Sequence, residues 1–430
     1  MLVESFSHTE LARAFALFGI AELLRWRTTL AAACFGLTFA TNAIFGCWMA
    51  MVFAISGLPR FWRMVGAGTP GAAIRWLMPA AVAFAVPAVP VAVWILSRPE
   101  VSVAVDFDYR EFLWSYYPKH FFIGASLWWP LIQMVAATAA ACVAARVLEQ
   151  RRDIQRLVLI IAGIFFLGII VGEVASSRTM LQMHFLRIDG ILILLATTLV
   201  GAALIAQVRS GQLIGFAAAA LGTLALFTGV WPIVLVAVIL SQTRPIEAFL
   251  ARNLPATIRA LLASRRFLGA CAALTIAFCV AANAYVYLMR IRPPAGIPEN
   301  IHLAGSTPLV RDWVEVQHWV RANTPPTAVF LLPASISDDF RVGAQRRIWV
   351  GMKDGAAAMW APSTYHQWRQ RALEIRSLGS DLTVLNGYAC THGIDYLVID
   401  LRSRGGQRVK PQTAVYANSW FEVHKASCGS

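Results

Sequence analysis

One polar stretch is the first place where this sequence could do chemistry. It runs from Asp106 to His120 (DFDYREFLWSYYPKH), between two apolar segments that are each long enough to cross a bilayer. The carboxylates of Asp106 and Asp108 are of the type that a divalent cation or a general base requires. Lys119 and His120 are cations suited to a phosphate group. The alternative interpretation is an aromatic belt at the membrane interface, with its charges solvated.

A second polar segment, residues 176–190 (SSRTMLQMHFLRIDG), carries further basic side chains. His184 and Arg187 are one helical turn apart, so in a helix they would face the same phosphate. Glu173 precedes this segment near the end of an apolar run, where a carboxylate is a functional candidate, although it could instead pair with Arg178. The predicted phosphate-binding residues are therefore Lys119, His120, His184 and Arg187, and the candidate catalytic carboxylates are Asp106 and Asp108.

A third charged group lies in the C-terminal part of the chain. Its members are Asp338, Asp339, Arg341, Arg346 and Arg347. Recognition of an anionic headgroup and salt bridging within the fold are both open for this group. The sequence contains no nucleotide-binding, zinc-peptidase or hydrolase motif of the common kinds. No metal site is predicted, and a divalent cation on the carboxylates named above is the one cofactor that the residue types allow.

The composition shows that a membrane must position these side chains. Of the 430 residues, 58% are hydrophobic and 14% are charged, whereas soluble domains carry about 25% charged residues. The formal net charge of +14 does not predict nucleic-acid binding, because many arginines lie in short loops between apolar runs. The predicted class is a mostly α, polytopic membrane protein embedded in a lipid bilayer.

The apolar runs predict about ten spans in residues 1–290, followed by an α/β domain in residues 291–430. Residues 28–57 and 213–240 are too long for one span, so we expect each to form two short helices, broken at Asn42 and at Trp231-Pro232. Basic segments at 25–27, 58–76, 146–156, 209 and 241–266 fall on one side, which the positive-inside rule makes cytoplasmic. Residues 97–119, residues 176–190 and the α/β domain then share the outer face.

The C-terminal domain has the pattern of a mixed α/β fold. We expect helices at 308–323, 363–378 and 382–392, strands at 328–332, 347–352 and 394–400, and a closing hairpin from 414–416 and 421–423. Cys390 and Cys428 are the two cysteines on the predicted outer side. A disulfide between them is one possibility that the sequence leaves open.

The paired short spans after a basic turn (RWRTTLAAACFGLTFATNAIFGCWMAMVFAI) resemble the helix pairs of polytopic GT-C glycosyltransferases. The C-terminal stretches WVEVQHWVRANTPPTAVFLLP, FRVGAQRRIWVGMKDG and IDYLVID are similar to the outer domains of uncharacterised bacterial GT-C-like proteins. The resemblance implies transfer of a sugar from a polyprenyl-phosphate carrier on the outer face. It also implies a catalytic carboxylate in a first outer loop between the first two spans. This chain shows no counterpart to that loop, so we expect that N-terminal spans are missing.

Two functions are expected from these observations. The first is a GT-C-like glycosyltransferase of the bacterial inner membrane, possessing a periplasmic α/β domain and using a polyprenyl-phosphate-linked sugar. The second is a non-catalytic membrane subunit for envelope assembly, whose outer domain binds a partner. A transporter is less favoured, because few ionisable residues lie in the middle of the spans.

Overall fold

The computed structural model of the chain divides into two compact units. It describes residues 8–98, 105–125, 128–175, 177–209, 213–242, 308–333, 340–379, 381–401 and 413–428, with a few single residues between 255 and 281. The helical unit comprises residues 1–98 and 107–280, and the α/β unit comprises residues 99–106 and 281–430. Three predicted features lie almost wholly outside the described residues. They are the domain boundary near residue 290, the part of the basic segment 241–266 beyond residue 242, and the last predicted span.

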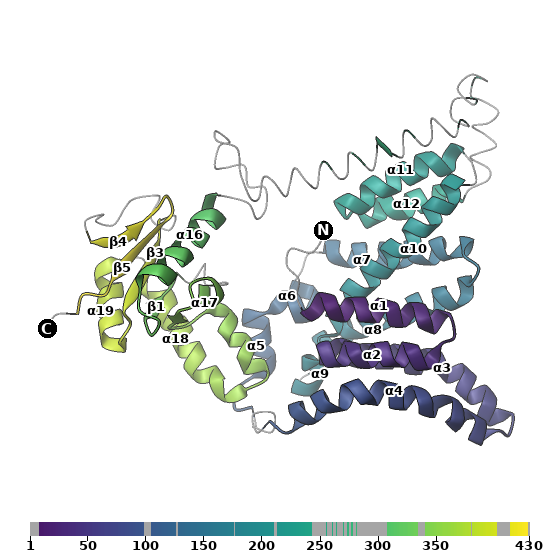
Figure 1. Cartoon of the computed structure of the whole chain (residues 1–430), viewed down its shortest axis with the longest axis horizontal. Coiled ribbons are helices and arrows are strands. Elements are labelled where there is room, and N and C mark those ends of the chain that lie inside the picture. Colours follow the sequence, from purple (N-terminus) through teal and green to yellow (C-terminus); the bar gives the residue numbers. More distant parts are fainter. Residues whose placement is uncertain are drawn as a thin grey trace. The chain divides into compact units, whose positions relative to one another are not determined.

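The described part of the helical unit is a set of helices packed side by side (Figure 1). In chain order they are α1 (His8–Leu24), α2 (Thr28–Thr41), α3 (Ala43–Gly66), α4 (Pro70–Leu96), α5 (Tyr109–Tyr116), α6 (Pro118–Phe121), α7 (Trp128–Ala144), α8 (Arg151–Val174), α9 (Arg178–Gln182), the 3-10 turn η4 (Phe185–Ile188), α10 (Asp189–Arg209), α11 (Leu213–Thr228) and α12 (Trp231–Ser241). Helix α2 packs against α1 and α4, and α12 packs against α11 and α7. This mostly helical architecture agrees with the predicted class.

Five helical segments among the described residues are long and apolar enough to cross a membrane. They are Ala43–Gly66, Pro70–Leu96, Trp128–Val147, Arg151–Val174 and Arg178–Gln207. The prediction of about ten spans is wrong for this part of the chain, because it counted short helices as full crossings. At about 1.5 Å per residue, the 14 residues of α2 rise about 21 Å, less than a hydrocarbon core of about 30 Å.

The predicted breaks within the two long apolar runs are confirmed. Asn42 is extended (φ −150°, ψ 102°), and its side chain accepts a hydrogen bond from the Phe45 N–H at 3.3 Å, which caps the start of α3. Gly229 has φ +71° between α11 and α12, a conformation that costs glycine little. The loop predicted at 58–76 is mostly helix instead, since α3 continues through Pro59 to Gly66 and α4 begins at Pro70.

The α/β unit is built on a five-stranded mixed sheet with strand order β2-β1-β3-β5-β4. Its elements are α16 (Pro308–Asn323), β1 (Val329–Leu331), α17 (Phe340–Gly343), β2 (Arg347–Ile348), η5 (Met352–Met359), α18 (Tyr365–Leu378), α19 (Leu382–His392), β3 (Tyr396–Asp400), β4 (Ala414–Ala417) and β5 (Phe421–Lys425). Strand β1 pairs in parallel with β2 and β3, while β5 is antiparallel to β3 and β4. The predicted helices and hairpin are confirmed, and the second strand is shorter than the predicted 347–352.

Neighbouring residues of β1 pack into two different hydrophobic cores, one on each face of the sheet. Phe330 packs with Trp313 of α16 and Phe421 of β5 on one face of the sheet. Leu331 packs with Leu385 of α19 on the other face. This alternation follows from the two-residue period of a strand, so helices cover both faces of the sheet (Figure 1).

Covalent and ionic contacts hold the loops of the α/β unit. Cys390 of α19 forms a disulfide with Cys428, with 5.3 Å between their Cα atoms. Arg341 forms a bidentate ion pair with Asp354. The buried guanidinium of Arg346 donates hydrogen bonds to four backbone carbonyls and to a threonine hydroxyl. In the third charged group of the sequence, Arg341 and Arg346 therefore have structural roles. Asp338 and Asp339 of that group lie outside the described residues.

Candidate functional site

The two polar loops meet at one end of the helical unit, where Arg110 of the first loop contacts the end of α8. Its guanidinium donates hydrogen bonds to the carbonyls of Gly172 (2.8 Å) and Ala175 (3.1 Å), and lies 3.8 Å from the carboxylate of Glu173. These carbonyls belong to the C-terminal turn of α8, where a cation is favoured by the helix dipole. The structure pairs Glu173 with Arg110, a partner that the sequence did not suggest.

The two candidate catalytic carboxylates have local structural roles. Asp108 is the N-cap of α5, and its carboxylate accepts a hydrogen bond from the Glu111 N–H at 2.9 Å. Asp106 belongs to the α/β unit, where its carboxylate lies 3.0 Å from the imidazole of His366. The sequence pattern suggested catalysis for both residues because carboxylates at caps and carboxylates at active sites look alike without coordinates.

Two glycines of α8 let aromatic residues of both loops approach the helix closely. A Cβ at Gly172 would collide with the carbonyl oxygen of Phe121, and a Cβ at Gly168 would lie 2.6 Å from the Cβ of Phe185. The ring of Phe121 thereby lies 4.1 Å, centroid to centroid, from the imidazole of His184. His184 is 7% exposed, so it is part of the packing between the loops.

Basic side chains from three elements converge around Asp189 at the start of α10. The Asp189 carboxylate interacts electrostatically with Arg13 of α1, His120 of α6 and Arg187 of η4. The guanidinium of Arg13 lies against Gly190, and it also pairs with Glu10 at 2.6 Å. We call Arg13, His120, Arg187 and Asp189 the loop-end cluster. Its members are far apart in the sequence and are brought together by the fold.

The neighbouring charges and partial burial change the pKa of His120. Partial desolvation and the positive charge of Arg187 lower the pKa of His120 below its ordinary value, and Asp189 opposes that shift. A lowered pKa favours the neutral imidazole of His120 at pH 7. A bound anion would raise the pKa of His120 and favour the protonated imidazolium.

Among the predicted phosphate-binding residues, the structure brings His120 and Arg187 together and places His184 beside them. The side chain of Lys119 lies outside the described residues. Arg13 was not predicted, although an arginine within an apolar helix is a signal that could have identified it. Asp189 lies in the second polar segment and was not predicted either. Within the described residues, no group of three or more metal-ligating side chains occurs, so a divalent cation stays a prediction.

The loop-end cluster has the residue types for binding an anion. Two guanidinium groups can donate paired hydrogen bonds to phosphate oxygens, and a histidine can add a third donor once protonated. Asp189 supplies a carboxylate that can accept a proton or a hydrogen bond from a hydroxyl group. Arg187 and Asp189 are both exposed, so a ligand can reach them.

Comparison with known proteins gives a family description for one segment. A family model described as a domain of unknown function (DUF6798) matches residues 311–375, which extend from α16 into α18. No curated protein matches the chain. No solved structure matches it either. The match covers part of the α/β unit, and the family description names no activity.

Proposed function

We propose that the loop-end cluster binds the phosphate of a lipid-linked sugar, and that the chain is a multi-pass membrane glycosyltransferase of the GT-C type. The observation that carries this proposal is the convergence of Arg13, His120 and Arg187 around one exposed carboxylate. The apolar helices beside the cluster suit a polyprenyl chain, and the cluster suits its phosphate. The relevant membrane is the bacterial inner membrane.

The chemistry of sugar transfer would use the cluster in two ways. Arg13 and Arg187 would stabilise the negative charge that develops on the departing lipid phosphate. Asp189 would accept the proton of the attacking hydroxyl group of the acceptor. This proposal moves the carboxylate role from Asp106 and Asp108 to Asp189, because Asp189 is the one of these three that lies among the basic residues of the loop-end cluster.

The disulfide supports an extracytoplasmic position for the α/β unit. Disulfides persist in oxidising compartments and are rare in the cytosol. The pairing of Cys390 with Cys428 is therefore expected of a periplasmic domain. On this proposal, the loop-end cluster faces the same side.

A second candidate function is a non-catalytic subunit for envelope assembly that binds a partner through its α/β unit. The observation in its favour is that Asp108 caps α5 and Asp106 faces His366, so neither selected carboxylate joins the cluster. Such a subunit would bind a lipid phosphate without transferring its sugar. An Asp189→Asn variant separates the two functions, since only an enzyme would lose transfer while keeping lipid binding.

Replacing Arg187 by glutamine should weaken binding of a short-chain polyprenyl phosphate to the full-length protein. Loss of hydrogen bonds to a charged group predicts a decrease of about tenfold or more in affinity. The measurement is a binding titration in detergent micelles. Arg98→Gln is the matched control, because Arg98 is an exposed arginine just beyond α4 that stacks on Trp94 at 3.6 Å. Equal losses in both variants would reject a specific phosphate site.

The affinity for the same lipid should rise as the pH falls. A bound phosphate raises the pKa of His120 above its value in the ligand-free protein, which burial lowers. The protonated ring therefore contributes fully to the affinity below the ligand-free pKa, and this contribution is lost as the pH rises through the pKa of the complex. Titrations between pH 5 and 8 test this. His120→Gln should flatten the profile, since Arg187 stays charged throughout and the lipid phosphate changes equally in both proteins. An unchanged profile would remove His120 from the site.

A further inference from the structure

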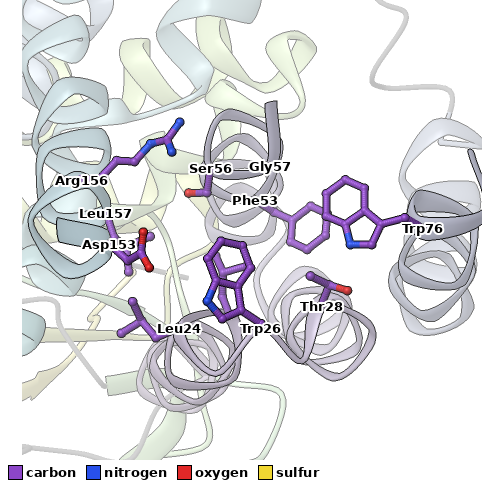
Figure 2. A pocket seen from close by; sticks show the side chains of 11 residues that line it. Leu24, Trp26, Thr28, Phe53, Ser56, Gly57, Trp76, Asp153, Arg156 and Leu157 are labelled. Carbon is purple, nitrogen blue, oxygen red and sulfur yellow. The ribbon is translucent and has the colours of Figure 1, made fainter. Parts of the chain in front are cut away.

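The helical unit has a hollow at the end opposite the loop-end cluster. Figure 2 shows the side chains that line it. Helix α8 connects the two places, because its last turn contacts the polar loops and its first turns line the hollow with Asp153 and Arg156. The apolar wall of the hollow includes Leu24, Phe53, Leu157 and the indoles of Trp26 and Trp76. The hollow therefore lies at the arginine-rich end of the bundle and is lined mainly by apolar side chains.

Trp26 is held at this hollow by an unusual backbone conformation. Its φ of 61° is in the left-handed region, which is costly for a bulky residue and must be stabilised by its surroundings. Glu22 provides this support, since it is 2% exposed and its carboxylate pairs with Arg25 at 2.7 Å and with Arg27 at 3.4 Å. The buried carboxylate thus clamps both neighbours of Trp26. The indole is left 51% exposed between them.

A guanidinium group lies between the two indoles. The Cζ atom of Arg60 is 5.7 Å from the ring centroid of Trp26 and 5.3 Å from that of Trp76. Such stacking holds a guanidinium in place while leaving its N–H groups available. Arg60 and Arg63 also line a shallow depression that shares Trp26 with the hollow. An apolar site and a cationic site are therefore contiguous.

Polar groups in the hollow lack partners within the described part of the chain. The Ser56 hydroxyl oxygen is buried without a hydrogen bond there, and such groups are rare unless a ligand or water satisfies them. Ser56 and Arg156 line the same hollow (Figure 2). The exposed Arg156 side chain forms no ion pair with any described residue, and Asp153, one helical turn before it, lines the same hollow.

We propose that this hollow binds one anionic phospholipid from the leaflet at the basic end of the helical unit. Its acyl chain would lie against Leu24, Leu157 and the indole of Trp76. Its phosphate would accept hydrogen bonds from Arg60 and Arg156, with Ser56 as a further donor. Phosphate suits this position better than a carboxylate, because arginines approach it from two helices and a phosphate has enough oxygens for both. The site is separate from the loop-end cluster and does not depend on the proposed transferase activity.

The test uses the full chain in lipid nanodiscs, with native mass spectrometry to count retained lipids. Phosphatidylglycerol is the anionic probe, phosphatidylcholine is the zwitterionic comparison, and inorganic phosphate is added as a competitor. Wild type should retain one phosphatidylglycerol, and the Arg60→Gln/Arg156→Gln double variant should retain it about tenfold more weakly, as expected for lost bonds to a charged group. Arg151→Gln/Arg152→Gln is the control, because both side chains are exposed at the same end of α8 and do not line the hollow.

Several results would overturn the proposal. Equal losses in the double variant and the control would indicate only diffuse attraction of anionic lipid to a basic surface. Competition by inorganic phosphate would indicate a free-phosphate site. Ser56→Ala repeats the test without removing charge, and should weaken retention about two- to fivefold while leaving the melting temperature in phosphatidylcholine nanodiscs unchanged. Unchanged retention in this variant would contradict the assigned position of the phosphate.

Discussion

The α/β unit should lose about 4 kcal/mol of stability when Cys390 and Cys428 are both replaced by serine. The disulfide closes a loop with a sequence separation of 38, and the entropy of closing a loop of that length in the unfolded chain corresponds to about 4 kcal/mol. Domains are stable by only about 5–15 kcal/mol, so this loss is a large fraction of the total. The double variant avoids leaving a single reactive thiol.

Chemical denaturation of the full-length protein, followed by limited proteolysis of the α/β unit, measures this effect. Adding reductant to wild type should reproduce the loss, and reductant should leave the double variant unchanged. Cys142→Ser is the control, since Cys142 is a free, half-buried cysteine of α7 in the helical unit. A wild-type α/β unit that resists proteolysis equally well in reductant would show that the disulfide contributes little to its stability.

The elements of the α/β unit could be predicted because their signals are local. Helix α19 is an example, with Asp381 as its N-cap and Gly393 at φ 65° just beyond its end. Both signals lie within a few residues of the helix they delimit. The strand β3 was likewise recognisable as a short apolar run next to that glycine. Local chemistry was sufficient for this part of the fold.

The candidate site depended on contacts between distant parts of the chain, which the sequence could not show. Arg110 belongs to the first polar loop and Glu173 to the last turn of α8, and the spacing of residues in the sequence does not show that they pair. Arg13 was overlooked because it is far from both polar loops in the sequence, although the fold places it against Gly190. Asp108 caps α5, a role that the sequence could not show, because a capping carboxylate and a catalytic one have the same local pattern. The stretch from Asp106 to His120 could be recognised as important, but the role of each residue could not.

The span count was wrong for a related reason. Hydropathy identifies apolar residues but does not show where a helix ends, so α2 was counted as a crossing although it has 14 residues. The same uncertainty affected residues 58–76, where Pro59 suggested a loop and instead lies within α3. Arg60 is consequently fixed on a helix, where it can stack between two indoles.

Replacing Gly172 by alanine should destabilise the helical unit and weaken lipid-phosphate binding at the loop-end cluster. The added methyl group would collide with the carbonyl oxygen of Phe121, a backbone atom that cannot rotate away. Overpacking of this kind costs about 1–3 kcal/mol. Displacing Phe121 would also move the adjacent His120 and disturb the packing of Phe121 against His184. We therefore expect a lower melting temperature together with a lower affinity for polyprenyl phosphate.

Gly163→Ala is the matched control, because it makes the same substitution on the same helix. A Cβ at Gly163 would meet no atom within 4 Å among the described residues, so alanine should stabilise α8 by up to about 1 kcal/mol through its helix propensity. The two variants should thus shift in opposite directions and differ by about 1–4 kcal/mol. Only Gly172→Ala should change ligand binding. If both variants shifted stability in the same direction, the close approach of Phe121 to α8 would be wrong, and the geometry of the loop-end cluster with it.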